Sequence, residues 1–349
     1  MTNGNVNDEL QGCLTARGVP TVPAKVVQVA VAVIKYEQAG VAKYLLATRH
    51  AHQHQGGKLE FVGGKIDPNE SAKTALIREV SEELGLDICQ NLITKMGKIH
   101  HDYADKSVCL HIYQVLLNDV QYLDFKDKTV GLDGQAIGFY DLAFILSHKA
   151  CFPSANAPIL TWLTLPKQLV ISHELAFFNE QTDWLDCYKK LPAGSTLLIR
   201  TLADTKTNAE LMEQLSDGGD VQFVVSCQDA VVWLESVLAV RLTQNELMAL
   251  DLAKLTLPSY PVIVSCHDEA SIFKANELAK MHPVMAILLS PVLPTLTHPE
   301  APSLGWEEFA RLSKLSFVPV VALGGVNAAD LPKALAHGAV AVAGIRGFI

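Results

Sequence analysis

Hydrophobic positions along the chain fall into two successive patterns. Between residues 26 and 142, long apolar strands alternate with polar loops, and one helical pattern without Pro or Gly runs from Ser71 to Leu84. The strands expected in this part are 26–34, 44–48, 92–101, 108–117 and 136–142, the first two forming a hairpin. The pattern predicts a mixed sheet that carries one prominent helix.

From residue 168 onward, short apolar strands alternate with helical patterns, which is typical of a (βα)8 TIM barrel. Its strands are expected near 168–172, 196–200, 222–226, 238–242, 261–265, 284–289, 318–323 and 339–343. The change of pattern falls at Leu163–Lys167. We therefore expect one domain over residues 25–163 and a second over residues 164–349. Residues 1–24 are polar and lack an apolar run, so we expect a disordered tail.

Composition narrows the class of protein. With 349 residues, 49% of them hydrophobic, the chain is long enough for two cores. Its net charge of −9 argues against duplex nucleic acid as a partner. The 7 cysteines are scattered and odd in number, which indicates neither a disulfide framework nor a zinc site and fits the cytoplasm. No apolar stretch is long enough to predict a membrane span.

Candidate chemistry is concentrated on the predicted helix. Glu79, Glu82 and Glu83 stand at i, i+3 and i+4, so their carboxylates share one face and favour a cation such as Mg²⁺ or Mn²⁺. An exposed acidic face held by salt bridges is the alternative. Ala72 and Leu76 lie on the face of Glu79 and Glu83, which indicates that this face is partly buried. Before the helix, Gly63 and Gly64 predict a turn whose backbone approaches a ligand.

Other polar residues have two interpretations each. His50, His52 and His54 form either a metal-binding tract or, as we favour, a solvated loop. Arg49 closes a predicted strand, where it contacts a substrate phosphate or is a surface residue. Asp133 precedes the last strand of the sheet, where it joins a metal site or caps a turn.

The residues around the helix match the complete signature of the Nudix family. Its specified positions are filled by Gly64, Glu70, Arg78, Glu79, Val80, Glu82, Glu83, Gly85 and Leu86. The resemblance implies an α/β/α sandwich with a mixed sheet and a metal-dependent hydrolase.

A closer resemblance links KLEFVGGKIDPNES (residues 58–71) and CFPSANAPIL (residues 151–160) to MutT-type 8-oxo-dGTP diphosphatases. By position, it implies catalytic roles for Glu79, Glu82 and Glu83, with Glu79 activating water. The implied metal site adds Gly64, Glu60 and Asp133 to these glutamates. The implied substrate-binding residues are Arg49, Phe61, Gly63, Lys65 and Asn156. Asn156 would read the purine edge, the alternative being a turn former between two prolines.

The second domain resembles thiamine phosphate synthase and its relative TenI in SPVLPTLTHPEAPSLGW (residues 290–306) and PVVALGGVNAADL (residues 319–331). The implied phosphate site consists of Thr295, Thr297, Gly324 and Gly325, although the glycines alone also fit a tight turn. Several positions depart from the family: Ser226 and Cys227 replace an Asn-Asp pair, Glu246 a metal aspartate, and Leu202 and His298 two lysines. These departures predict a barrel that binds a thiamine-type phosphate without synthase activity.

Together these features predict Mg²⁺-dependent conversion of 8-oxo-dGTP and water to 8-oxo-dGMP and diphosphate, which sanitises the nucleotide pool in DNA repair. One alternative is a Nudix hydrolase acting on thiamine-precursor diphosphates. In that case the barrel would be a thiazole-phosphate tautomerase or a non-catalytic phosphate-binding module.

Overall fold

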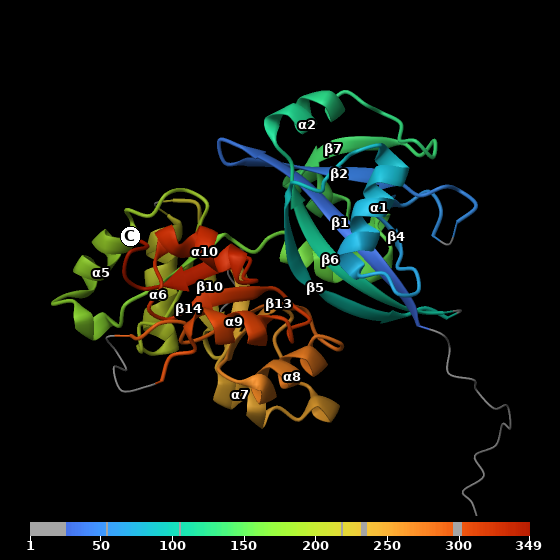
Figure 1. Ribbon diagram of the computed structural model, residues 1–349. Helices are drawn as coiled ribbons and strands as arrows, with labels where there is room; N and C mark the ends of the chain where they lie inside the picture. Colours follow the sequence, from blue (N-terminus) through green and yellow to red (C-terminus); the bar gives the residue numbers. More distant parts are fainter. Residues whose placement is uncertain (1–25, 54, 105, 218, 232–235, 296–301) are drawn as a thin grey trace, which may run out of the picture.

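The computed structural model describes residues 26–53, 55–104, 106–217, 219–231, 236–295 and 302–349. Its N-terminal part is a 7-stranded sheet in the order β3-β2-β1-β6-β5, with β4 paired to β1 and β7 to β2 (Figure 1). β1 and β6 are parallel and the other pairs antiparallel, so the predicted mixed sheet is confirmed. The strands are β1 (Val27–Gln38), β2 (Val41–Thr48), β3 (Leu59–Glu60), β4 (Val62–Lys65), β5 (Leu92–Asp102), β6 (Ser107–Leu116) and β7 (Ile137–Asp141).

Helices cover both faces of this sheet because side chains alternate along its central strand. Ala32 and Ile34 of β1 point into a core shared with Leu76 of the long helix. Val31 and Val33 point into the opposite core, which contains Ile145 and Ile159. The result is the predicted α/β/α sandwich. Its helices are α1 (Ala72–Leu84), α2 (Asp119–Phe125), α3 (Leu142–Ser147) and α4 (Ala157–Trp162).

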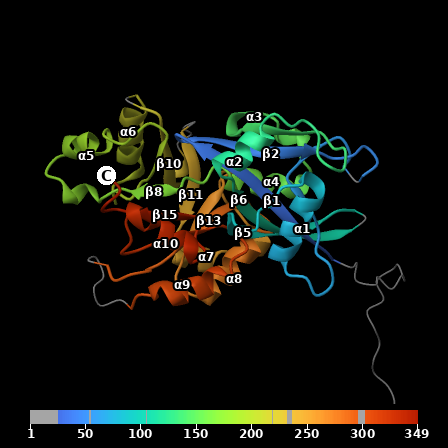
Figure 2. The same cartoon turned by 45° about the horizontal axis from the view of Figure 1, so that its top comes forward.

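The C-terminal part is a closed barrel of parallel strands, as predicted (Figure 2). Its interior is filled by apolar side chains such as Leu169, Val224, Ile263 and Met285, so it is a packed core. The strands are β8 (Gln168–Ile171), β9 (Ser195–Leu198), β10 (Val221–Ser226), β11 (Val237–Leu242), β12 (Val262–Cys266), β13 (Val284–Leu289), β14 (Val320–Leu323) and β15 (Ala341–Gly344). The outer helices are α5 (Gln181–Tyr188), α6 (Thr205–Ser216), α7 (Gln244–Ala249), α8 (Glu269–Leu278), α9 (Gly305–Ser313) and α10 (Leu331–Ala336).

One sequence prediction is wrong. Gly63 and Gly64 do not form a turn but lie in β4, where they pair with Val31 and Ala30 of β1. The sheet can recruit them because a Cβ on Gly63 would lie 2.1 Å from the carbonyl oxygen of Ala30, so only glycine permits this approach of the two strands. Helix α2 was not predicted, although Asn118 and Gln121 form the capping box that begins it.

The sheet and the barrel are in direct contact. The edge strand β5 donates from Lys98 N to Phe317 O at 2.9 Å, and Lys95 Nζ donates to Lys314 O and Ser316 O at 3.1 and 2.9 Å. Buried Trp162 of α4 donates from Nε1 to Val284 O at 3.0 Å. These partners lie at the N-terminal ends of β13 and β14. The C-terminal ends of the barrel strands, where barrel sites form, therefore face away from the sheet.

Helix lengths and compositions also bear on membranes. Among the described residues, none of the helices combines the length and the apolar character that crossing a bilayer requires.

Candidate active site

The acidic residues are held by a well-defined helix. α1 begins at Ser71, whose side chain accepts a hydrogen bond from Thr74 N at 3.1 Å, and it ends at Gly85 in the left-handed conformation (φ 68°). Leu76 is fully buried against the sheet. The side chain of Glu79 is 15% exposed, whereas that of Glu82 is 59% exposed. Glu79 therefore lies on the partly buried face, as predicted, and Glu82 lies at its rim.

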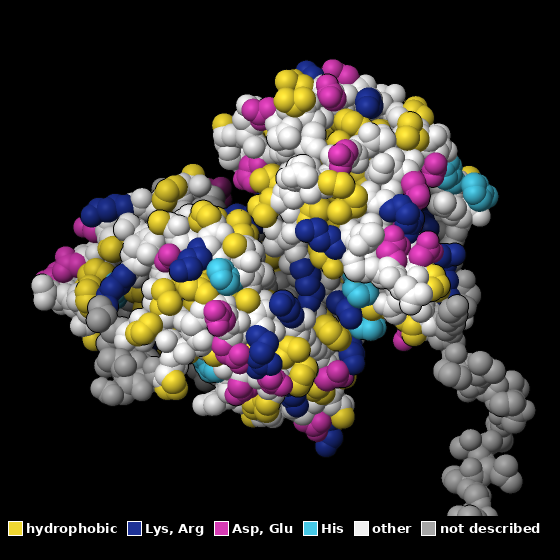
Figure 3. Space-filling view, in the orientation of Figure 1, with side chains coloured by type: hydrophobic (Ala, Val, Ile, Leu, Met, Phe, Trp, Pro, Cys, Tyr) yellow, Lys and Arg dark blue, Asp and Glu magenta, His cyan; other side chains and the backbone are white. Residues whose placement is uncertain are grey.

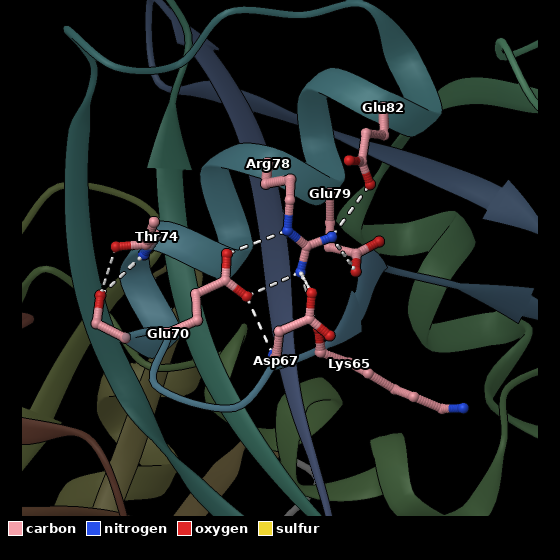
Figure 4. Close-up of polar contacts among 8 residues, drawn as sticks. Lys65, Asp67, Glu70, Thr74, Arg78, Glu79 and Glu82 are labelled. Carbon is pink, nitrogen blue, oxygen red and sulfur yellow. Dashed lines mark hydrogen bonds and ion pairs between the residues drawn. The ribbon is translucent and has the colours of Figure 1, made fainter.

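Arg78 organises the carboxylates of this helix (Figure 4). Its Nη1 donates to Glu79 at 2.8 Å and to Glu82 at 3.1 Å. Its Nε and Nη2 donate to the two oxygens of Glu70 at 3.1 and 2.9 Å, and Nη2 also reaches Lys65 O at 3.0 Å. These bonds raise the pKa of Arg78 above its usual value and lower that of Glu70. Arg78 thus joins the helix to the end of β4 and fixes where Glu79 points.

Gly64 provides the space that Glu79 occupies. A Cβ on Gly64 would lie 2.1 Å from the carboxylate carbon of Glu79, so any larger residue would displace that carboxylate. The strand backbone and the acid are therefore in contact. The sequence prediction placed the backbone of Gly64 beside a ligand, and the structure places Gly64 in a strand beside Glu79.

A second group of carboxylates surrounds Glu83. Its pKa is raised to about 8, first by burial and then by the negative charges of Glu60, Glu79 and Asp133. The positive charge of Arg49 lowers the pKa of Glu83, and Arg49 also forms an ion pair with Glu60. Asp133 is held close because Leu132 N donates to Glu83 O at 2.7 Å. Glu60, Glu79 and Asp133 therefore lie near enough to Glu83 for their charges to act on it, and the charge of Arg49 only partly offsets theirs.

The chemistry of these carboxylates suits a divalent cation. Carboxylate oxygens are the ligands that Mg²⁺ and Mn²⁺ prefer. Burial and the neighbouring carboxylates raise the pKa of Glu83, whereas a bound cation would lower it. In the described part of the chain no three Asp, Glu, His or Cys side chains converge on one point, and the carboxylates of Glu79 and Glu82 turn towards Arg78. A cation would compete with Arg78 for these two residues.

The predicted base-reading residues lie on the other side of β3. Phe61 is 3% exposed and stacks on Phe152 with 5.8 Å between the ring centroids. Lys58 Nζ donates to Phe152 O at 3.3 Å and thereby ties the 151–160 segment to β3. Asn156 is only 8% exposed at the end of a short 3₁₀ helix (Ser154–Asn156), and within the described residues its side-chain amide makes no hydrogen bond. Such an amide is available to a ligand.

Lys65 and the histidine tract, which the sequence analysis also singled out, lie apart from the carboxylates and from Asn156. The side chain of Lys65 extends away from Arg78 into solvent, and only its carbonyl belongs to the Arg78 network (Figure 4). His52 is exposed and stacks on His50 with 5.5 Å between ring centroids, which agrees with a solvated loop; His54 lies outside the described residues. Arg78 was not among the candidate site residues, although its place in the Nudix signature was the available signal.

In the barrel, the predicted glycine turn follows β14. Gly324 and Gly325 have φ of 90° and 70°, and a Cβ on either would lie within 2.8 Å of the 291–294 segment. Leu293 N donates to Gly324 O at 2.9 Å, so the turn rests on the segment that leads to Thr295. Thr297 and His298 lie outside the described residues.

Side chains at the mouth of the barrel form hydrogen bonds with other residues of the chain. Glu246 accepts hydrogen bonds from the amide and hydroxyl of Thr243, both at 2.7 Å, and so caps its own helix. Ser226 donates to buried Asp229 at 2.8 Å, and Asn208 donates to the same oxygen at 3.2 Å. The sequence prediction missed Asp229, because no spacing singles it out.

Comparison with known proteins identifies the two halves. Residues 26–129 match the family model described as NUDIX domain, and residues 198–348 match the one described as Thiamine monophosphate synthase. The chain therefore joins a Nudix domain to a barrel of the thiamine monophosphate synthase and TenI type.

Individual relatives cover one half each. An 8-oxo-dGTP diphosphatase of Proteus vulgaris is 39% identical over 70 residues, which are 20% of this chain and 61% of that protein. An 8-oxo-dGTP diphosphatase of Escherichia coli is 28% identical over 139 residues, or 40% of this chain and 97% of that protein. A thiamine-phosphate synthase of Persephonella marina is 28% identical over 166 residues, or 46% of this chain and 77% of that protein.

Proposed function

We propose that the Nudix domain is a Mg²⁺-dependent nucleoside triphosphate pyrophosphohydrolase that converts 8-oxo-dGTP and water to 8-oxo-dGMP and diphosphate in the cytoplasm. The observation that carries this proposal is the arrangement around β3 and β4. The carboxylates near Glu83 lie on the face of the sheet that α1 covers, and the buried side chains of Phe61 and Asn156 lie on the opposite face. Similarity to 8-oxo-dGTP diphosphatases supports the choice of substrate.

The metal would be held by Glu79, Glu82 and Glu83, assisted by Glu60, Asp133 and the backbone of Gly64. When bound, Mg²⁺ neutralises phosphate charge and lowers the pKa of water. Glu79 accepts the proton of the attacking water, which forms a bond to the β-phosphorus while the bond to the α-phosphate oxygen breaks. The monophosphate leaves with that oxygen. Arg78 keeps Glu79 aligned, and Arg49 lies close enough to the acids to meet a substrate phosphate.

The base is recognised by shape and by hydrogen bonds. Phe61 and Phe152 offer an apolar aromatic wall for a purine ring. The Asn156 amide carries both a donor and an acceptor, and the edge of an oxidised guanine differs from that of guanine in these groups. Discrimination follows because a substrate with the wrong edge leaves a buried amide unpaired.

A substrate panel tests the proposal. We expect kcat/KM to be highest for 8-oxo-dGTP among 8-oxo-dGTP, dGTP, CTP and the pyrimidine diphosphate precursor of thiamine. In ¹⁸O-labelled water the label should enter diphosphate and not the monophosphate. Glu79→Gln should abolish turnover while circular dichroism stays unchanged. Preference for the thiamine precursor, or full activity of folded Glu79→Gln protein, refutes the proposal.

A second candidate function rests on the attached barrel. Because residues 198–348 match the thiamine monophosphate synthase family, the Nudix domain is alternatively a hydrolase of thiamine-precursor diphosphates. The barrel then binds a thiamine-type phosphate, as a thiazole-phosphate tautomerase or without catalysis. The same panel decides between the two substrates, and calorimetric titration of the protein with thiamine phosphate tests the barrel.

A further inference from the structure

A pocket of about 280 Å³ lies between the sheet and the barrel. It is formed by β5 and α4 on one side, and by the end of α8 and the segment before β14 on the other. Its floor includes buried Trp162 and its wall half-buried Phe317. Both domains are needed to form it, and neither the Nudix glutamates nor the mouth of the barrel belongs to it.

The position of the pocket is fixed by close packing around it. A Cβ on Gly97 would lie 2.6 Å from both Phe317 O and the Trp162 ring, so a glycine is required where β5 meets the barrel. Asn276 holds the facing segment, donating to Leu315 O at 2.9 Å and accepting from Phe317 N at 2.7 Å. The pocket is therefore preformed, which lowers the cost of binding a ligand.

The charge of the pocket is opposite to that of the protein. The chain carries 37 acidic and 28 basic residues. Yet the described residues that line the pocket include no carboxylate; their polar side chains include Lys98, His100, His101, Lys280 and His282. Figure 3 shows Lys, Arg and His side chains gathered where the two domains meet. An acidic protein that presents a cationic cavity favours an anionic ligand.

Lys98 is the central cation of this cavity. Its Nζ lies 5.4 Å from the centroid of Phe317, and the ring of His100 lies 5.4 Å from the same centroid. The pKa of His100 is lowered first by burial and then by the charges of Lys98 and Lys280, so both lysines lie near this ring. Lys280 also pairs with Glu277 at 2.7 Å, whereas Lys98 has no carboxylate partner among the described residues. Lys98 is therefore the cation with most capacity for an anion.

We propose that this interdomain pocket binds a phosphorylated compound with a flat ring, of the class of nucleoside monophosphates. The phosphate pairs with Lys98 and Lys280, and the ring packs beside Phe317 and His100. Apolar and aromatic walls with a few convergent polar groups are typical of small-ligand sites. Because both domains contribute, occupancy stabilises their contact by mass action.

Calorimetric titration of the full chain in EDTA tests the site, since removal of divalent cations suppresses binding at the Nudix glutamates. The probes are dGMP, inorganic phosphate and deoxyguanosine. We expect dGMP to bind at least tenfold more tightly than either fragment. Lys98→Gln should weaken dGMP binding at least tenfold. The matched control is Lys128→Gln, because Lys128 also lies over an aromatic ring, 3.5 Å from the centroid of Phe125, but outside the pocket.

A second measurement locates the ligand. Exposed His100 reacts with diethyl pyrocarbonate, and dGMP should reduce its modification, read by mass spectrometry of tryptic peptides, while modification of His52 stays unchanged. No binding of dGMP at millimolar concentration overturns the proposal. So does equal weakening by the two lysine variants, equal affinity for dGMP and phosphate, or unprotected His100.

Discussion

The carboxylate of Glu79 occupies the position that a side chain on residue 64 would take, since a Cβ on Gly64 would lie 2.1 Å from the carboxylate carbon. We expect Gly64→Ala to displace Glu79 while the fold persists, because the obstructing atoms are the end of a flexible side chain. A shift of about 1 Å in a catalytic group costs on the order of 100-fold in rate. The kcat on 8-oxo-dGTP should fall by about that factor.

The matched control for this substitution is Gly219→Ala, because a Cβ on Gly219 meets no atom within 4 Å. It should leave kcat within about twofold and the melting temperature within about 2 °C of wild type. Wild-type kcat in folded Gly64→Ala protein would show that the space beside Glu79 is not needed.

We infer from its contacts that Arg78 positions Glu79, so its substitution should affect catalysis more than stability. Lysine keeps the charge but cannot reproduce the forked contacts to Glu70 and Glu79. We expect Arg78→Lys to lower kcat at least tenfold with KM little changed, and to cost about 1–2 kcal/mol in the free energy of unfolding. Kinetics and urea denaturation measure the two effects.

Two further variants distinguish positioning from general damage. Glu70→Gln should reproduce part of the loss in kcat, and combining it with Arg78→Lys should add little, because both act on one network. Arg311→Lys, at an exposed arginine that also bridges two glutamates (Glu269 and Glu308), should leave kcat unchanged. Full additivity of the Glu70 and Arg78 effects would contradict the network.

Asn156 should govern the choice of base. We expect Asn156→Ala to lower kcat/KM for 8-oxo-dGTP at least tenfold more than for dGTP, since a buried amide that pairs with one purine edge discriminates against the other. Ser154→Ala, in the same segment, removes a hydroxyl that lies 3.0 Å from His101 Nε2 and should leave the ratio unchanged. An equal loss on both nucleotides would exclude base reading by Asn156.

Sequence reasoning predicted the architecture because periodicity reports burial. The apolar run of β1 and the apolar spacing of α1 were sufficient for a mixed sheet that carries one helix, whereas the two helical layers were implied by the resemblance to the Nudix family. The barrel strands were recognisable as short apolar segments. The structure of Gly63 and Gly64 was not predictable, since their strand pairing depends on contact with Ala30. For the same reason Asp229, buried beneath Ser226, was missed, and the packing of β5 on the barrel was not foreseen.

Two lysines between the domains make stability depend on pH. The pKa of Lys95 and of Lys167 is lowered to about 8, in both cases first by burial. From pH 8 to pH 10 the unfolded chain keeps protons on these lysines that the folded chain has released, so this contribution to the free energy of unfolding rises with pH. Buried cysteines with raised pKa, such as Cys266, act in the opposite direction.

The comparison with Lys95→Met/Lys167→Met isolates the lysines. We expect the free energy of unfolding of wild type, relative to this variant, to increase by about 1 kcal/mol or more between pH 7.5 and pH 9.5, measured by urea denaturation. A difference that is independent of pH would show that the two ammonium groups titrate normally. Lys43→Met/Lys73→Met, at lysines outside the interface, serves as the control.

The barrel should not make thiamine phosphate. In the thiamine phosphate synthase family a carboxylate pair holds the metal on the diphosphate substrate. Here Ser226 ends β10 and Cys227 follows it, and Glu246 caps its own helix. Leu202, exposed with φ 59°, replaces a lysine that would meet the diphosphate. We expect the glycine turn to bind one phosphate at most, because its backbone supplies no cationic side chain to stabilise departing diphosphate. Incubating the purified protein with both synthase substrates and Mg²⁺ should yield no thiamine phosphate by chromatography, beside an active synthase as positive control. Robust turnover would contradict this interpretation of Ser226, Cys227 and Leu202.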